Sequence, residues 1–178
     1  MKMETDKVYF AVKDRLLTFK YRGAMRLADT RGICLGMEKL LDRLFDEPDF
    51  DHIVIDLSEM ESIDSTHLGV LARIARFSQS QFSRRPVIIS NSDHILEILE
   101  SVGFDSIFHI ASDLEGTAVE GIEIEELDGD HLRLLRVVLE THRELMRLSR
   151  KNQELFKTVE EVTESQMRFP TVSDLDQL

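Results

Sequence analysis

Residues 53–70 read IVIDLSEMESIDSTHLGV, and this stretch decides the predicted fold class. Its opening apolar run predicts a strand over residues 52–57 that is covered on both faces, or nearly so. The short polar residues Asp64 and Ser65 then precede a segment whose apolar residues recur at helical spacing, which is the pattern of a helix start. A buried strand that leads into a helix indicates an α/β architecture, and it places Ser65 in the first turn of the helix.

The rest of residues 1–112 continues this alternation. Strands are predicted at 8–12, 16–21, 52–57, 86–90 and 106–110, and helices at 30–45, 66–82 and 93–102. The residues between them support these boundaries, since Asp14 and Arg15 suit a hairpin turn, Ser92 or Asp93 suits a helix start, and Gly103 suits a helix end. We therefore predict one α/β domain over residues 1–112.

The sequence changes character after this domain. Residues 113–129 are acidic and glycine-containing and are interpreted as a connector, with a short strand at 119–124. Residues 130–166 contain no Gly and no Pro and are rich in Leu, Glu, Arg and Lys, which predicts one long helix capped by Asp130. The polar residues 167–178 lack periodicity and are expected to form a flexible tail.

The predicted long helix carries a heptad pattern, with aliphatic residues at alternating spacings of three and four. The expected interface residues are Leu134, Val138, Leu145, Leu148, Asn152, Leu155, Val159 and Val162. The polar Asn152 stands at an interior position of this pattern, where such a residue can fix register. The pattern allows a coiled coil with a second copy of the chain or with a partner helix. The alternative is that the helix folds back on its own domain.

Composition limits the partners, the location and the chemistry that can be expected of this protein. The chain has 178 residues, 22 basic and 34 acidic, and its net charge of −12 repels nucleic acid, so a protein partner is expected. No apolar run reaches the roughly 18 residues of a membrane span, and the N-terminus lacks the apolar core of a secretory signal, so a cytoplasmic location is expected. The single cysteine, Cys34, excludes an intrachain disulfide and is best interpreted as a small buried group.

Nothing in the sequence has the spacing of an enzyme or a metal site. Ser65 lies outside any Gly-x-Ser-x-Gly motif, and His67, two residues away, cannot readily face its hydroxyl as a base. No glycine-rich phosphate loop and no ligand spacing among the six histidines are found. We expect no catalytic activity, no cofactor and no metal. Taken alone, Asp64 and Ser65 are most simply a helix cap.

The runs Ile55-Asp56-Leu57 and Ile63-Asp64-Ser65-Thr66, followed by Leu68-Gly69, resemble the signature of STAS domains of the anti-sigma-factor-antagonist family. Residues 99–108, LESVGFDSIF, resemble the end of that domain. The resemblance covers about residues 6–112 and implies a mixed β-sheet flanked by helices. A Ser or Thr after Asp is phosphorylated in this family, which implies Ser65 as the phosphoacceptor and Thr66 as the less favoured alternative.

The family resemblance also implies a partner-binding surface and a mechanism. The expected partner-binding residues are Met25, Asp64, Ser65, Thr66, His67 and Leu68. The unmodified protein would bind an anti-sigma factor or switch kinase, release it once Ser65 is phosphorylated, and be restored by a phosphatase. Many members have Gly where this chain has His67, so a bulky titratable group is expected in the first helical turn. The alternative is a constitutive scaffold or sensory subunit that works through its C-terminal helix, with Ser65 a plain cap.

Overall fold

The structure is a computed structural model that describes residues 6–113, 115 and 120–169. Within these residues six strands form one mixed sheet in the order β5-β4-β3-β2-β1-β6. Their bounds are β1 Lys7–Lys13, β2 Leu16–Met25, β3 His52–Ile63, β4 Val87–Ile89, β5 His109–Ala111 and β6 Ile122–Glu123. Strands β2 to β5 run parallel, whereas β1 is antiparallel to both β2 and β6.

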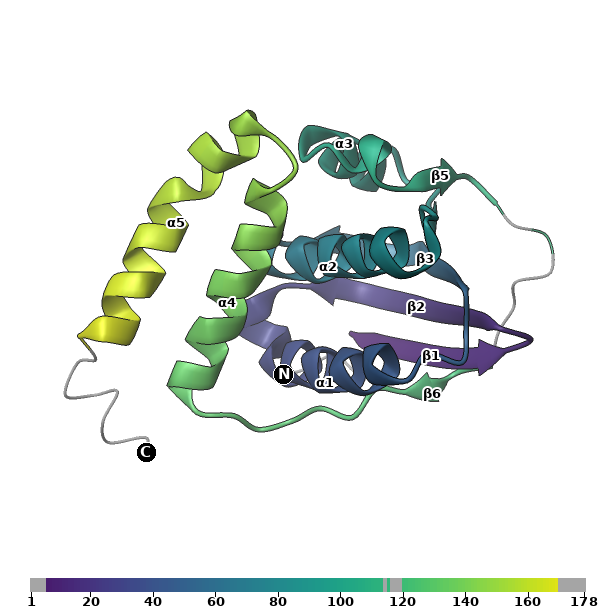
Figure 1. The fold of residues 1–178 in the computed structure, drawn as a ribbon, viewed down its shortest axis with the longest axis horizontal. Coiled ribbons are helices and arrows are strands. Elements are labelled where there is room, and N and C mark those ends of the chain that lie inside the picture. The colour runs from purple at the N-terminus through teal and green to yellow at the C-terminus, as the bar shows by residue number, and fades with distance from the viewer. Residues whose placement is uncertain (1–5, 114, 116–119, 170–178) are drawn as a thin grey trace.

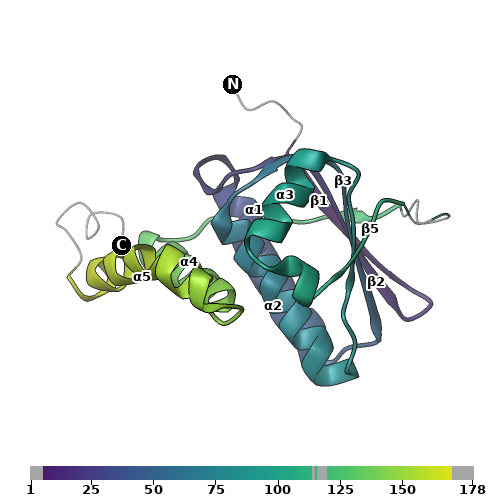
Figure 2. The same cartoon turned by 90° about the horizontal axis from the view of Figure 1, so that it is seen from above.

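The helices form two layers on one side of the sheet (Figures 1 and 2). Their bounds are α1 Leu27–Asp46, α2 Ser65–Phe82, α3 Asp93–Ser101, a 3-10 turn at Phe104–Ser106, α4 His131–Met146 and α5 Arg150–Arg168. Helices α1, α2 and α3 pack on the sheet, and α4 and α5 lie beyond α1 and α2, away from the sheet (Figure 2). We call these the inner layer and the outer layer.

Alternating residues of the central strands build the core between the sheet and the inner layer. Phe19 and Tyr21 of β2 and Ile55 and Leu57 of β3 are fully buried, and Leu71 of α2 packs into the same cluster. Each large apolar side chain buried in this way contributes about 1.5–3 kcal/mol. The predicted fold class, a mixed sheet flanked by helices with helical structure at the C-terminus, is confirmed, and a coiled coil is not.

Within the predicted domain, three strands differ from their predicted extent by more than one residue, and the first of them, β2, continues to Met25 instead of ending at Tyr21. Strand β3 runs to Ile63 because it keeps pairing with β2 across two register shifts, so the segment before Ser65 is strand rather than loop. The last strand of the domain begins at His109, since Phe104–Ser106 forms a 3-10 turn where the strand start was predicted. In the connector, β6 covers Ile122–Glu123, and residues 116–119 lie outside the described residues.

The single helix predicted over residues 130–166 is wrong, because two helices occupy this segment. Helix α4 begins after the predicted cap Asp130, whose Oδ1 accepts from the Arg133 amide at 2.7 Å, and it ends at Met146. Ser149 then caps α5, its Oγ accepting from the Asn152 amide at 3.1 Å. The break between the two helices contains no Gly and no Pro. This serine cap stabilises it, together with side-chain hydrogen bonds to the carbonyls that the helix ends leave free. The break lets α5 turn back along α4 (Figure 1).

The connector crosses α1 in close contact and delivers α4 to its place on α2. A Cβ added at Gly36 would lie 2.0 Å from the carbonyl oxygen of Glu125, so only glycine allows the connector backbone this near the helix. The amide of Leu127 also donates to the carbonyl of Gly32 at 3.0 Å. The outer layer is therefore attached to the inner layer by backbone contacts before α4 begins.

In the part of the chain that the structure describes, every helix is too short or too polar to cross a bilayer.

Candidate partner-binding and modification site

One carboxylate organises the start of α2. Asp64 is the N-cap, and its Oδ1 accepts from the His67 amide at 3.0 Å. Its Oδ2 accepts from the amide of Leu27, the first residue of α1, at 2.6 Å, and the amide of Asp64 donates to the carbonyl of Met25 at 2.9 Å. Asp64 therefore caps two helices at once and joins the end of β2 to the end of β3.

Ser65 follows as the first residue of α2, and its hydroxyl contacts α4. The Ser65 Oγ lies 2.8 Å from Nε2 of His142, which is 77 positions away in the sequence. The other ring nitrogen of His142, Nδ1, lies 2.7 Å from the carbonyl oxygen of Val138. A carbonyl only accepts, so Nδ1 carries the proton and Nε2 accepts the hydroxyl proton of Ser65.

The environment of His142 keeps its ring neutral. Burial lowers the pKa of His142 below its usual range, and the Val138 carbonyl and the charge of Asp64 only partly offset this. The ring of Phe156, from α5, meets the imidazole edge to face at 5.4 Å between centroids. A neutral imidazole that accepts from a serine hydroxyl is the arrangement that makes such a hydroxyl more nucleophilic.

His67 lies on the opposite side of the first turn and packs against α1. Its Nε2 is 2.8 Å from the Thr30 hydroxyl, which itself donates to the carbonyl of Arg26 at 2.8 Å. His67 therefore donates from Nε2, and burial lowers its pKa. Thr30 has non-helical backbone angles at a kink in α1, and its contact with His67 lies at this kink.

The structure separates the predicted partner-binding residues into two groups. Asp64 and Ser65 are half-buried, and the cover over Ser65 includes α4. Met25, Thr66, His67 and Leu68 are buried, with at most 4% of their surface exposed. These four residues offer no surface for direct contact in this conformation.

The predicted helix interface is divided in the same way. Leu145 and Asn152 are buried within the chain, and Leu134, Val138 and Leu148 are half-buried. On α5, by contrast, the aliphatic side chains of the pattern remain exposed, at Leu155, Val159 and Val162. The predicted role of Asn152 inside a coiled-coil seam is wrong. Its Nδ2 donates to the carbonyls of Leu145 and Val102, and this satisfies the ends of α4 and α3.

A group of charged residues joins α1, α2 and the adjoining part of α4. The guanidinium of Arg73 donates to Glu38 and to Asp42, both at 2.6 Å. Burial raises the pKa of Glu38 to about 7, and Arg73 opposes this rise. Glu140 of α4 contributes negative charge to the same group. Part of this carboxylate charge is therefore lost near neutral pH.

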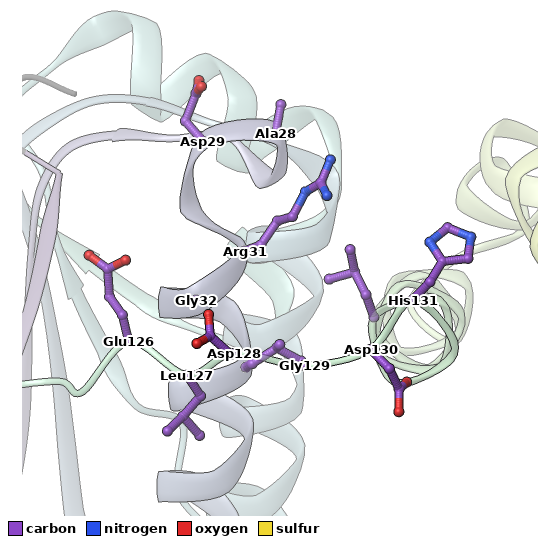
Figure 3. A pocket seen from close by; sticks show the side chains of 12 residues that line it. Ala28, Asp29, Arg31, Gly32, Glu126, Leu127, Asp128, Gly129, Asp130 and His131 are labelled. Atoms are coloured by element: carbon purple, nitrogen blue, oxygen red, sulfur yellow. The ribbon is translucent and has the colours of Figure 1, made fainter. Parts of the chain in front are cut away.

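A cavity of about 450 Å³ lies where the connector passes the start of α1 (Figure 3). Carboxylates dominate its lining, which includes Asp29, Glu126, Asp128 and Asp130, whereas Arg31 supplies a positive charge. Such a lining disfavours phosphate groups and nucleotides. Within residues 6–113, 115 and 120–169, no cluster of His, Cys, Asp or Glu could hold a metal ion.

Sequence reasoning missed His142, the nearest functional neighbour of Ser65. The six histidines show no ligand spacing, and no local motif links position 142 to position 65. The connector, which lies against α1 at Gly36, and the close packing at Gly69 bring the two together. Cys34, in contrast, is buried as predicted, and burial raises the pKa of its thiol to about 12.

The sequence matches the STAS domain family over residues 13–116, and the chain belongs to this family. The matched region contains the sheet from β2 to β5, the inner helices and Ser65. The predicted family is thereby confirmed. No curated protein matches the sequence closely enough to be counted as a relative.

Several solved structures are similar to this chain. A Thermotoga maritima protein assigned as an anti-sigma factor antagonist has 20% identity and a TM-score of 0.50, covering 60% of this chain and 87% of its own. An anti-sigma factor antagonist from Mycobacterium paratuberculosis has 14% identity and a TM-score of 0.47, with 61% and 86% covered. SpoIIAA of Bacillus in its unphosphorylated form has 12% identity and a TM-score of 0.47, with 62% and 93% covered. At 20% identity, the likeness to the Thermotoga maritima protein concerns the fold alone.

Proposed function

We propose that this chain is an anti-sigma-factor antagonist that works by partner switching, with Ser65 as its phosphoacceptor. The observation that carries the proposal is the place of Ser65. Within a STAS domain it is the first residue of α2, directly after the capping Asp64, with its hydroxyl bonded to a neutral imidazole. A helix N-terminus favours an added negative charge, so the fold would tolerate a phosphate there.

The electrostatics of the site would make phosphorylation an effective switch. A phosphate adds about −1.5 to −2 charges beside Asp64, in a surface that a partner must desolvate. It would also face Nε2 of His142, which presents a lone pair in this structure. The negative charge of the phosphate would raise the pKa of this imidazole, so modification would also change the contact of α4 with Ser65.

The partner class follows from charge and family together. A net charge of −12 favours a protein partner over direct binding of nucleic acid. The proposed partners are an anti-sigma factor or switch kinase, which binds the unmodified protein, and a phosphatase, which restores it. Asp64 and Ser65 lie at the centre of the proposed contact surface, and the buried Met25, Thr66 and His67 hold them in position. The proposed role is that of a binding protein without catalytic activity, acting in a cytoplasmic signalling pathway.

The phosphoacceptor is tested by peptide mapping. The tagged full-length chain is isolated from its source cells, and the tryptic peptide of residues 44–73 is analysed by mass spectrometry. We expect phosphate on Ser65 in the wild type and in the control Ser58→Ala, because Ser58 is an exposed serine of the same peptide. Phosphate that persists in Ser65→Ala would assign the site elsewhere, first to Thr66.

The switch is tested by comparing co-purified proteins. Ser65→Ala should retain the partner, and Ser65→Asp should lose it. Each 1.4 kcal/mol of added electrostatic cost lowers affinity about tenfold, so a loss of tenfold or more is expected. Equal recovery of the partner by both variants would contradict partner switching.

One observation favours the second candidate, a constitutive scaffold or sensory subunit that acts through its C-terminal helices. The outer surface of α5 exposes Leu155 and Val162, at 58% and 51%, together with Val159. A scaffold would bind equally well with Ser65→Asp but would lose its partner when Leu155 and Val162 are both replaced by Glu. Light scattering of the same double variant tests self-association. If the wild type self-associates through α5, the variant should form a smaller particle than the wild type.

A further inference from the structure

The outer layer covers one defined line of residues along α2. Ser65, Gly69, Ala72 and Arg76 follow one another at spacings of four, three and four, so they share one face of the helix. We call this line the α2 stripe. Helix α4 crosses α1 and α2 on the side away from the sheet (Figures 1 and 2). The stripe is therefore occupied by a segment of the same chain.

Gly69 allows the backbone of another helix to lie directly against the α2 stripe. A Cβ at this position would lie 2.2 Å from the carbonyl oxygen of Thr141 and 2.6 Å from its Cβ. A glycine inside a helix costs about 1 kcal/mol relative to alanine, and here it allows two helices to approach until their backbones meet. A helix that docks here needs a small residue over Gly69.

A charged contact lies at the other end of the stripe. Arg76 donates from Nε and from one terminal nitrogen to the carboxylate of Glu144, at 2.8 and 2.7 Å. Glu144 also accepts from Arg147 at 2.7 Å and is only 8% exposed. Two arginines therefore hold one carboxylate of α4, three positions after Thr141.

The contact between α4 and the stripe borders a cavity of about 530 Å³, lined by Ala72, Ala75 and Arg76 of α2 and by Glu144 and Leu148 of the outer layer. Helix α4 buries Val137 and Leu145 in the core, whereas its side-chain bonds to the two ends of the stripe are polar. Polar contacts of this kind can be replaced by those of another helix with matching groups.

We propose that α4 is an internal ligand of the α2 stripe, and that a partner protein takes its place by presenting a helix with the same features. Those features are a small residue over Gly69 and, three positions later, a carboxylate for Arg76. This proposal deepens the proposed function and rests on it for the identity of the partner. Displacing α4 frees the Ser65 hydroxyl from His142, which couples partner binding to access of the phosphoacceptor.

A synthetic peptide tests the stripe without any cellular partner. The probe is a fluorescein-labelled peptide of residues 130–149, titrated with the full-length chain and followed by fluorescence anisotropy. In the wild type the tethered α4 competes with the peptide, so the apparent affinity is reduced by the small fraction of open molecules. Glu144→Arg places a third positive charge among Arg76 and Arg147 and releases the chain's own α4.

We expect Glu144→Arg to bind the peptide at least tenfold more tightly than the wild type. The matched control is Glu154→Arg, which makes the same charge change at an exposed position of α5 and should bind like the wild type. Adding Gly69→Leu to Glu144→Arg should abolish binding, since its side chain fills the space that the peptide needs. Its Cβ points at α4 and not into the sheet, so the domain still folds, as far-UV circular dichroism would verify.

Amide hydrogen exchange measures α4 directly in the same proteins. We expect faster exchange of α4 in Glu144→Arg than in Glu154→Arg. Full protection of α4 in Glu144→Arg would overturn the proposal, since α4 would then be a fixed part of the fold. If α4 exchanges fast in Glu144→Arg but the peptide does not bind, the proposal is overturned as well, because the uncovered stripe would then not bind a helix. Neither experiment involves phosphate, so their failure leaves Ser65 as phosphoacceptor untouched.

Discussion

The inner and outer helix layers of this protein are held by different kinds of contact. Beneath α2, buried aliphatic and aromatic side chains such as Leu71 and Phe19 interlock with little polar content. Above α2, a glycine, a serine–histidine hydrogen bond and ion pairs add to buried apolar side chains of α4 and α5 such as Leu145 and Phe156. Apolar burial resists separation of the layers, whereas the polar contacts can be exchanged for water or for another polar surface. The fold therefore combines an almost wholly apolar core with a cover of mixed apolar and polar contacts.

The largest effect is expected from a substitution inside the inner layer. Leu71→Ala removes a fully buried side chain between α2 and the sheet and should lower the free energy of unfolding by about 3 kcal/mol. Urea unfolding measures this loss. The control Leu155→Ala, on the exposed surface of α5, should change stability by less than about 0.5 kcal/mol. Similar losses for both would remove the distinction between the layers.

The next effect concerns the carboxylate that caps two helices. Asp64→Ala removes the acceptor for the amides of Leu27 and His67 and should cost about 2 kcal/mol. Glu61→Ala, an exposed carboxylate three residues earlier, is the control and should be close to neutral. If Asp64→Ala unfolds at the same urea concentration as the control, the double cap does not contribute to stability.

A smaller and more local effect is expected in the outer layer. Asn152→Ala leaves the carbonyls of Leu145 and Val102 without their side-chain donor and should cost about 1–2 kcal/mol. Because α5 lies on the surface, the loss should appear as faster amide exchange in α5 with little change in the sheet. The neighbouring exposed residue provides the control, Gln153→Ala. Uniformly faster exchange throughout the sheet would show that the two layers unfold together.

The smallest effect is a pH dependence carried by His142. Its folded-state pKa is lowered, so the unfolded chain, with a histidine pKa near about 6.5, takes up the proton first as the pH falls. The stability contributed by the neutral ring is present at pH 7 and declines below the unfolded pKa. The groups that face the ring are Ser65, the Val138 carbonyl, Phe156 and, by its charge, Asp64.

Urea unfolding of wild type and His142→Gln between pH 7 and 5 isolates this contribution. The glutamine cannot protonate in this range, so the wild type should lose more stability than the variant on acidification. Taking the difference between the two proteins cancels the contributions of His67 and Glu38, whose pKa values are shifted in opposite directions. Parallel pH profiles would indicate that His142 is not buried as a neutral base.

Most of the inner layer could be predicted from the sequence because its signals are local. The apolar periodicity of α1 and α2, the cap at Ser92 and the glycine after α3 each act within a few residues. The order of these elements was enough to identify an α/β fold, and the motif around Ser65 was enough to indicate its family.

The outer layer could not be predicted in the same way because its signals are long-range. The break at Ser149 has no Gly or Pro to mark it, and the bonds that hold it come from Asn152 and the carbonyl of Val102, 50 residues earlier. Gly36 appears in the sequence as an isolated glycine, and its role emerges only when the connector lies against α1. The pairing of Ser65 with His142 depends on the connector, which places α4, and on the close approach at Gly69.

The double cap at Asp64 also has a consequence for how a modification would spread through the molecule. The two oxygens of this carboxylate hold the first turns of α1 and α2, which begin 38 residues apart in the sequence. A negative group on Ser65 would repel the Asp64 carboxylate. Because this carboxylate bonds to both helices, the repulsion would affect the first turn of α1 as well as that of α2. A single phosphate would then change the structure at the starts of two helices. One of these, the start of α1, borders the acidic cavity beside the connector.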